Sequence, residues 1–350
     1  MKRRWVRWLP AAVIPAAIAA GALIAPLTAG AADLPSKTPA DVLKLVAASD
    51  VRAFSGTVEQ SSDLGLPSLP TVGSGPGSQS DATNVIDLLT GSHTAKVYAD
   101  GPSKVRVQVL DQLAERDVVR NGADVWLYTS TGEKVTHVTL PSRTAEKTTP
   151  DATTTTPAQL AERFLASVEP STSVTLGANT TVAGRDAYDL VLTPNTSATL
   201  VGSVSIAVDG QTGVPLRVQV AARGQQSTAF EVGFSSFDPS APSADVFAFT
   251  PPKGATVTEQ ALPAKGERTH AEAGHPKPVV SGTGWSSIVT VPVGTVPASV
   301  TSSPLYGQLT TAVPGGRALS TSLMSVLLTD DGRVLAGAVP VSALEAAAAK

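Results

Sequence analysis

The chain has 350 residues, of which 4% are aromatic and none is cysteine. Without cysteine there can be neither disulfide bonds nor a lipid-modified N-terminal cysteine, so the folded protein must rely on a hydrophobic core. Residues 1–31 hold four of the 26 basic residues and no acidic one, which leaves 22 basic residues against 29 acidic residues beyond them. This negative balance argues against nucleic acid as a partner.

Residues 1–31 have the pattern of a secretory signal peptide. Four basic residues precede an apolar run from Leu9 to Leu27, and the small residues Ala29-Gly30-Ala31 follow it. An uncleaved membrane anchor is the alternative, because the apolar run is close to the length of a membrane span. Three prolines within the run favour removal. We therefore expect an extracytoplasmic protein, secreted or held in the cell envelope of a bacterium.

Two amphipathic helices are predicted in residues 32–260. In "TPADVLKLVAASD", Thr38 is the N-cap, and Leu43 and Val46 lie on one apolar stripe. After a polar, Thr-rich segment over 141–156, "TPAQLAERFLASV" begins in the same way and has Leu160 and Phe164 on its apolar side. We expect both helices to cover the same face of a sheet.

The remainder of residues 32–260 is predicted to form antiparallel strands. Alternating stretches are joined by short turns such as Asn121-Gly122 and Asp209-Gly210, which supply the backbone conformation of a hairpin. A Gly/Ser-rich loop over 71–83 lacks any periodicity. The predicted fold class is α+β: a curved antiparallel sheet that forms an unclosed β-barrel with helices as a lid.

The hairpin strand "DVWLYT" places apolar side chains on both faces of the sheet. Val125 and Leu127 alternate with Trp126 and Tyr128. A sheet that is apolar on both sides needs two covers, and one of them can be a ligand. The alternative is that Trp126 belongs to an ordinary packed core.

Residues 261–282 are charged and rich in Pro and Gly, which indicates a linker. Residues 283–350 are predicted to form a small C-terminal α/β module. Its elements are a helix around Leu305 to Val313, a hairpin at Asp330-Asp331-Gly332 and a closing helix in "PVSALEAAAAK". Whether this module folds separately or docks on the main sheet is left open.

The sequence holds no recognisable catalytic motif. A nucleophile elbow, a phosphate loop and a dinucleotide-binding loop are all missing. His270 and His275 stand in the linker, where solvation is a simpler reading than a shared cation, and Asp330 and Asp331 are typical turn residues. We therefore expect no enzymatic activity, no metal site and no cofactor.

The hairpin "VVRNGADVWLYTSTGEKVTHVTLP" resembles a strand pair of the lipoprotein carrier family LolA. The stretch "SIAVDGQTGVPLRVQV", with its turn at Asp209, Thr212, Gly213 and Pro215, resembles the closing strands of the same superfamily. The resemblance covers residues 38–259. The sigma-factor regulators RseB and MucB share this fold and add a smaller C-terminal domain. The stretch "LMSVLLTDDGRVLAGAV" resembles the hairpin of that domain. The chain also resembles the actinobacterial branch of the superfamily.

This resemblance implies two functions. The first is non-enzymatic binding of acyl chains of lipids or lipoproteins in an apolar cavity between sheet and helices. The second is regulation through binding of an anti-sigma factor or another membrane-protein ectodomain. The candidate cavity or lid residues are Leu43, Val46, Trp126, Tyr128, Leu160 and Phe164.

Overall fold

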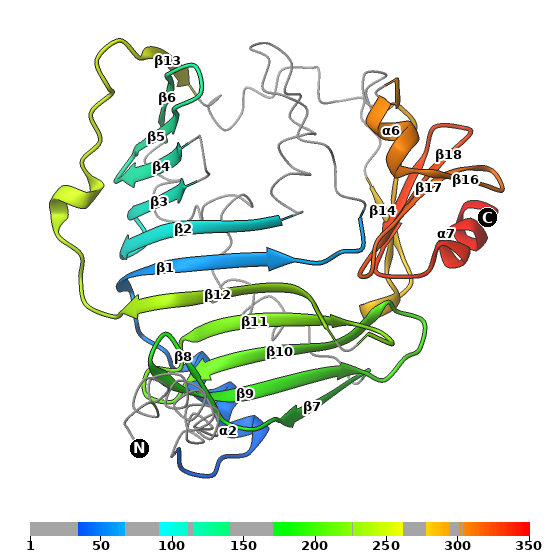
Figure 1. The fold of residues 1–350 in the computed structure, drawn as a ribbon, viewed down its shortest axis with the longest axis horizontal. Coiled ribbons are helices and arrows are strands. Elements are labelled where there is room, and N and C mark those ends of the chain that lie inside the picture. The colour runs from blue at the N-terminus through cyan, green and yellow to red at the C-terminus, as the bar shows by residue number, and fades with distance from the viewer. Residues whose placement is uncertain are drawn as a thin grey trace, which may run out of the picture.

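The computed structural model describes residues 34–66, 91–110, 115–140, 171–225, 227–261, 278–294, 301–302 and 304–350. These residues form two β-sheets with few helices (Figure 1). The predicted signal peptide, the Gly/Ser loop, the Thr-rich segment, the helix expected after it and most of the predicted linker lie outside the described residues.

The larger sheet has thirteen strands in the order β13-β6-β5-β4-β3-β2-β1-β12-β11-β10-β9-β7, with β8 paired to β9. It curves without closing, because the strands at its two ends do not pair with each other, and the predicted unclosed sheet is confirmed (Figure 1). The strands are β1 (Ala53–Ser62), β2 (Gly91–Asp100), β3 (Lys104–Leu110), β4 (Glu115–Asn121), β5 (Asp124–Thr129), β6 (Lys134–Thr139), β7 (Thr172–Leu176), β8 (Thr180–Val182), β9 (Arg185–Pro194), β10 (Val201–Asp209), β11 (Pro215–Ala222), β12 (Thr228–Asp238) and β13 (Thr256–Ala261).

One pairing in this sheet is parallel. β13 runs alongside β6 with Thr256 opposite Lys134, whereas the other strand pairs described in this sheet are antiparallel. The chain leaves β12 at Asp238, passes through the short helix η2 (Ala244–Phe247) and reaches the edge of the sheet beside β6 (Figure 1). We call residues 239–255 the crossing segment. The sheet is therefore mixed, where the sequence predicted an antiparallel one.

The first helix, α2 (Pro39–Ala47), begins as the sequence predicts. The Thr38 hydroxyl accepts a hydrogen bond from the Asp41 amide at 3.2 Å, and the Asp41 carboxylate accepts one from the Thr38 amide at 3.3 Å. The hydrogen bonds from Thr38 hold the pKa of Asp41 below its ordinary value. This reciprocal cap fixes where the helix starts. Val42 is fully buried and anchors α2 against the sheet beside β7 and β9.

The smaller sheet has six strands in the order β14-β15-β19-β18-β17-β16. Its core joins Leu327 and Leu335 to Leu344 of the last helix. The elements are β14 (Val279–Ser281), η4 (Gly284–Ser286), β15 (Ile288–Val291), α6 (Pro304–Leu309), β16 (Thr311–Val313), β17 (Gly316–Ser320), β18 (Ser325–Thr329), β19 (Val334–Gly337) and α7 (Val341–Ala348).

The helix expected around Leu305 to Val313 is shorter than predicted. It ends at Leu309, and Thr311–Val313 pairs with β17 instead. The Arg317 guanidinium donates a hydrogen bond to the Thr310 carbonyl at 2.7 Å. A side chain therefore satisfies a backbone oxygen at the point where the helix ends and the strand begins. The hairpin at Asp330-Asp331-Gly332 and the closing helix are confirmed.

The smaller sheet contacts one end of the larger sheet. Trp285, Leu323 and Ala338 pack against the core of the larger sheet. The hydrogen bonds that join the two parts include Trp285 Nε1 to Thr172 Oγ1 at 2.7 Å, the Ser322 amide to the Leu64 carbonyl at 2.9 Å, and the Leu200 amide to the Ala338 carbonyl at 2.8 Å.

Candidate ligand-binding face

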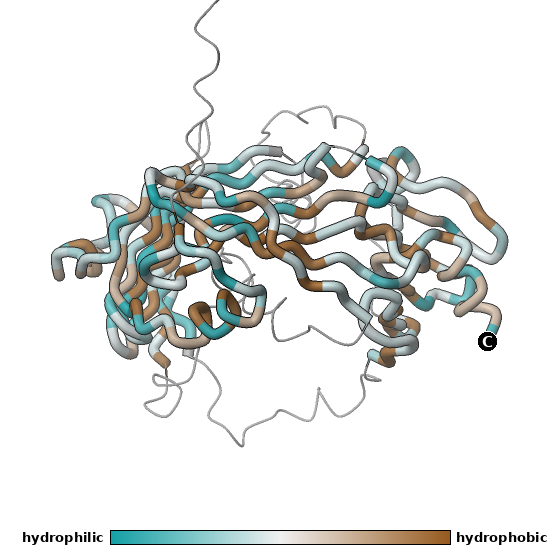
Figure 2. The backbone as a smooth tube through the Cα atoms, turned by 90° about the horizontal axis from the view of Figure 1, so that it is seen from below, coloured by the Kyte–Doolittle hydropathy of each residue, from teal (hydrophilic) through white to brown (hydrophobic). Residues whose placement is uncertain are grey.

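The two faces of the curved sheet differ in chemistry, because side chains alternate along each strand. On one face, Val97, Val107, Val118 and Leu127 stand opposite one another in a row across β2 to β5. We call this the apolar face and the opposite one the polar face. Figure 2 shows apolar and polar positions alternating along the strands.

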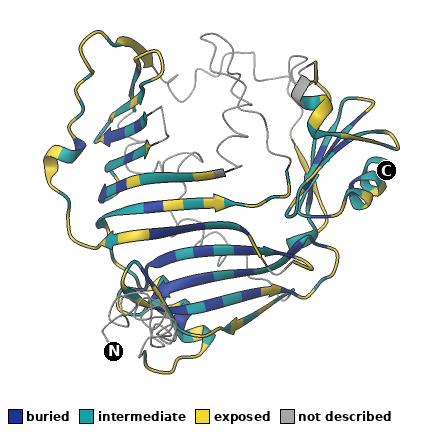
Figure 3. Ribbon diagram, in the orientation of Figure 1, coloured by how far each residue is buried: buried dark blue, intermediate teal, exposed yellow. Residues whose placement is uncertain are grey.

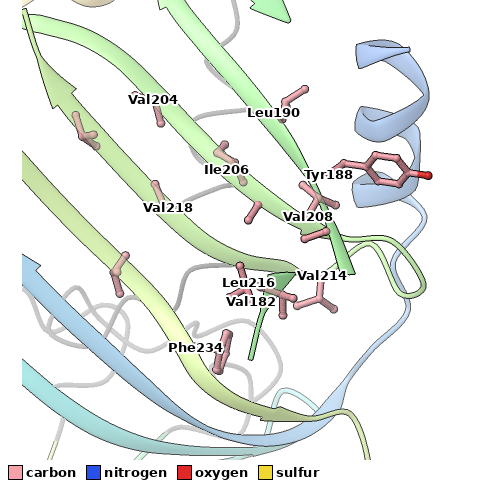
Figure 4. Close-up of a cluster of buried hydrophobic side chains, with 14 of the residues drawn as sticks. Val182, Tyr188, Leu190, Val204, Ile206, Val208, Val214, Leu216, Val218 and Phe234 are labelled. Carbon is pink, nitrogen blue, oxygen red and sulfur yellow. The ribbon is translucent and has the colours of Figure 1, made fainter. Parts of the chain in front are cut away.

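Over β9 to β12 the apolar face is closed into a core. Leu190, Ile206 and Val218 are completely buried there. At one end of this core Tyr188 lies beside α2, and its hydroxyl donates to the Pro35 carbonyl at 2.8 Å (Figure 4). Burial raises the pKa of Tyr188. This half of the sheet serves as a rigid base for the rest.

Three phenylalanines stand where the closed half meets β1. Phe234 lies edge-on to Phe54 with ring centroids 6.0 Å apart, and Phe237 lies 5.7 Å from Phe54. A Cβ atom at Gly56 would come within 2.8 Å of the Phe234 ring, so the glycine makes room for this aromatic cluster. The apolar face therefore continues without a break from the closed half into β1 and β2.

Over β1 to β6 the burial of the apolar face falls toward β5: Val97 and Val107 are buried, whereas Val118 is half-buried. Val105, Val109 and Val125 are half-buried, and Leu127 is 41% exposed. Figure 3 shows the contrast, with β10 and β11 mostly buried and β1 and β2 mostly intermediate or exposed. An extended apolar surface that is only partly covered is a typical place for an apolar ligand to bind.

The polar face over β3 to β6 is covered by the crossing segment. Arg106 donates to the Val246 carbonyl at 3.1 Å, and Phe249 lies 5.5 Å from the Trp126 ring and 6.2 Å from the Tyr128 ring. The crossing segment runs outside the curve of the sheet (Figure 1). The apolar face consequently lines the inside of that curve.

The structure divides the predicted site residues into two groups. Leu43 and Val46 of α2 pack against the core under the apolar face. Trp126 and Tyr128 stand on the polar face under the crossing segment, so the structure does not bring them together with the α2 residues. Leu160 and Phe164 lie outside the described residues and stay predictions. The residues that best mark the inside of the curve are instead Val107, Val118, Val125 and Leu127.

A second apolar surface belongs to the six-stranded sheet. Leu327 and Leu335 point toward α7, so their strand neighbours Val326, Leu328 and Val334 point to the other side, where they are half-buried. Helix α7 lies on the side of this sheet that is turned away from the curved sheet (Figure 1). The half-buried face is thus turned toward the curved sheet.

His137 on the polar face has charged partners that sequence reasoning missed. Its Nε2 lies 3.0 Å from Asp124 Oδ1, and its Nδ1 lies 2.8 Å from Glu259 Oε2. Desolvation acts to lower the pKa of His137, but the two carboxylates outweigh it and raise this pKa above its ordinary value. The hairpin register pairs Trp126 with His137 and so could have indicated Asp124, whereas Glu259 arrives only through the parallel strand β13.

Two further features bear on the class of site. Within the described ranges, His, Asp and Glu side chains nowhere gather in a group of three or more that could hold a metal ion. Of the helices that the structure describes, none is long and apolar enough to cross a membrane.

These features define a class of β-proteins with a curved, unclosed sheet whose inner face is apolar. The family model of the predicted periplasmic proteins DUF2092 matches residues 79–259, just over half of the 350 residues, so the chain belongs to that family. A search of curated protein sequences finds no match.

The chain is also similar to solved structures. In the Pseudomonas aeruginosa MucA/MucB complex, the match has 17% identity and a TM-score of 0.43 over 88% of this chain and 96% of that chain. A LolA superfamily protein from Nitrosomonas europaea matches with 10% identity and a TM-score of 0.25 over 61% of this chain and 99% of that one. An uncharacterized conserved protein from Thermus thermophilus matches with 13% identity and a TM-score of 0.35 over 63% of this chain and 98% of that one.

Proposed function

We propose that this protein binds acyl chains of lipids or lipoproteins outside the cytoplasm, without catalysing a reaction. The observation that carries the proposal is the row of Val97, Val107, Val118 and Leu127 inside the curve, in which burial falls from the buried Val97 and Val107 through the half-buried Val118 to Leu127, which is 41% exposed. Covering such side chains with an acyl chain removes apolar surface from water, at about 25 cal/mol per Å². The sequence resemblance to lipoprotein carriers supports the same ligand class.

Native mass spectrometry tests the proposal. Residues 32–350 purified from a secreting host should carry lipid, and organic extraction should release acyl chains. A protein that is well folded, empty and unable to take up added lipid would overturn the proposal.

The sheet offers a matched pair of variants for this experiment. Leu127 on the apolar face and Leu110 on the polar face are 41% and 40% exposed. Leu127→Asp places a carboxylate on the proposed binding surface and should abolish lipid retention, whereas Leu110→Asp should leave it unchanged. Trp126→Ala should also keep lipid bound in the folded protein, because Trp126 lies on the other face. Equal effects of the two Asp variants would contradict the assignment of the face.

A second candidate function is regulation through a protein partner, as in the regulators that the C-terminal hairpin resembles. The observation that favours it is the docking of the six-stranded sheet through Trp285 and Ala338, which makes a two-module protein. The partner would be the ectodomain of a membrane protein, such as an anti-sigma factor. Chemical cross-linking in the native envelope tests this function. Deletion of residues 283–350 should remove the cross-linked partner, and an unchanged product would contradict a role for this module.

A further inference from the structure

The two faces of β1 to β6 differ in charge as well as in polarity. On these strands the carboxylates all stand on the polar face, where Asp117 pairs with Arg106 and Glu115 with Gln108. The register places Glu59, Asp100, Glu115, Asp117 and Asp124 on that side.

The apolar face of the same strands carries cations instead. Arg116 and Arg120 flank Val118 on β4, and Lys134 begins β6. Arg120 is buried, donates to the Gly122 carbonyl at 3.2 Å and has its pKa lowered by burial. Arg116 is half-buried and Lys134 is exposed, so both are less covered than Arg120.

Arg116 and Lys134 belong to one row across the sheet. Each stands opposite Thr129, and the adjacent row on this face holds Val118 and Leu127. Residues two apart on a strand are separated by about 7 Å. The cationic side chains of one row therefore lie next to the apolar side chains of the adjacent row on the same face of the sheet.

This arrangement matches an amphiphile with a negative head group. On the six strands, a ligand anion on this face would meet cations and no carboxylate. Arginine and lysine form strong charge-assisted hydrogen bonds with phosphate and carboxylate oxygens, and these bonds strengthen beside apolar surface where water is scarce. A neutral or zwitterionic head group gains less from the same cations.

We propose that the apolar face of β1 to β6 binds acyl lipids with an anionic head group, with Arg116 and Lys134 contacting the head group and Val118 and Leu127 the acyl chain. The inference rests on the proposed lipid-binding function and adds the charge of the ligand to it.

The test compares two lipids that have the same acyl chains and head groups of different net charge. Dilauroyl phosphatidylglycerol and dilauroyl phosphatidylcholine are titrated separately into residues 32–350, and bound lipid is measured by native mass spectrometry. The anionic lipid should bind about tenfold more tightly, as expected for one or two charge-assisted contacts. Raising the salt concentration should narrow the difference. Arg116→Gln combined with Lys134→Gln should reduce anionic binding to the level of the zwitterionic lipid.

Matched controls come from the polar face. Lys96→Gln and Arg217→Gln remove the same total charge from the opposite side of the sheet and should keep the preference. If the double variant at Arg116 and Lys134 fails to fold, Lys134→Gln alone provides the test at an exposed position. Equal affinity for both lipids in the unaltered protein would overturn the inference while leaving lipid binding intact. The same holds if the control variants lose as much anionic-lipid binding as the variant at Arg116 and Lys134. Failure of both lipids to bind would overturn the proposed function itself.

Discussion

Trp126 on β5 and His137 on β6 stack with their ring centroids 3.9 Å apart and their planes 12° from parallel. The stacked imidazole lies between Asp124 and Glu259, within hydrogen-bonding distance of both. A neutral imidazole has a single N–H group, so only the protonated ring can donate to both carboxylates. His137 thus joins β5, β6 and β13 most firmly when it is charged.

The stability of the protein should depend on pH through His137. Because the pKa of His137 is raised in the folded protein, its contribution is complete below about pH 6.5 and is lost as the pH rises through the folded pKa. Both carboxylates are exposed, so the contribution should be less than about 1 kcal/mol. Urea unfolding at pH 6 and pH 9 measures it. His137→Gln should remove this difference, whereas His93→Gln should retain it. An unchanged difference in His137→Gln would assign the effect to other groups.

Breaking the ion pair between Arg106 and Asp117 should be costly. Arg106 Nη2 lies 2.6 Å from Asp117 Oδ2, and Asp117 is 2% exposed. Burial raises the pKa of Asp117, and Arg106 opposes that rise. Arg106→Ala leaves the carboxylate without its cation and should lower the free energy of unfolding by about 3 kcal/mol at pH 7.

Two comparisons check this prediction. The deficit of Arg106→Ala should shrink between pH 7 and pH 4, because the isolated Asp117 has a further raised pKa and takes up a proton in the folded state. Lys104 lies on the same strand as Arg106, and Lys104→Ala, which breaks a more exposed pair with Asp100 of β2, should cost less than about 1 kcal/mol. Similar losses of unfolding free energy in both variants would mean that the buried pair stabilises the fold no more than the pair between Lys104 and Asp100.

Alanine at Gly213 should displace helix α2. Gly213 has φ +73°, and a Cβ atom there would overlap the Leu45 carbonyl oxygen of α2. Gly224 has a similar φ of +77° with open space around it, so Gly224→Ala should cost only the backbone strain, about 1 kcal/mol. Gly213→Ala adds the steric overlap and should cost about 2 kcal/mol more. Thermal unfolding of both variants measures the difference, and equal losses would show that α2 adapts.

Removing Trp285 should uncouple the two sheets. Its indole donates to Thr172 and packs against the core of the larger sheet. Trp285→Ala should separate calorimetric unfolding into two transitions, since each sheet has its own core and their contact would be weakened. Val293→Ala, at a site 58% exposed in the same part of the chain, is the control and should leave the unfolding profile unchanged. A single unfolding transition in Trp285→Ala would mean that other contacts couple the unfolding of the two sheets.

Local sequence patterns were sufficient for much of the secondary structure. Thr38 and Asp41 predict the start of α2, because the cap needs only residues three apart. Alternation predicts that Trp126 and Leu127 lie on opposite faces, since successive strand residues always do. Gly122 marks its hairpin through a positive φ of 64°, which other residues rarely adopt.

The sequence by itself therefore determined most of the strands and turns, the capped helix and the division of each strand into two faces, because all of these depend on residues close together in the chain. Only the tertiary structure decided which face lies inside the curve. That choice depends on the crossing segment, which covers Trp126 with Phe249 and adds β13 in parallel beside β6. Glu259 meets His137 across 122 positions of sequence, and no local pattern records a pairing over such a distance.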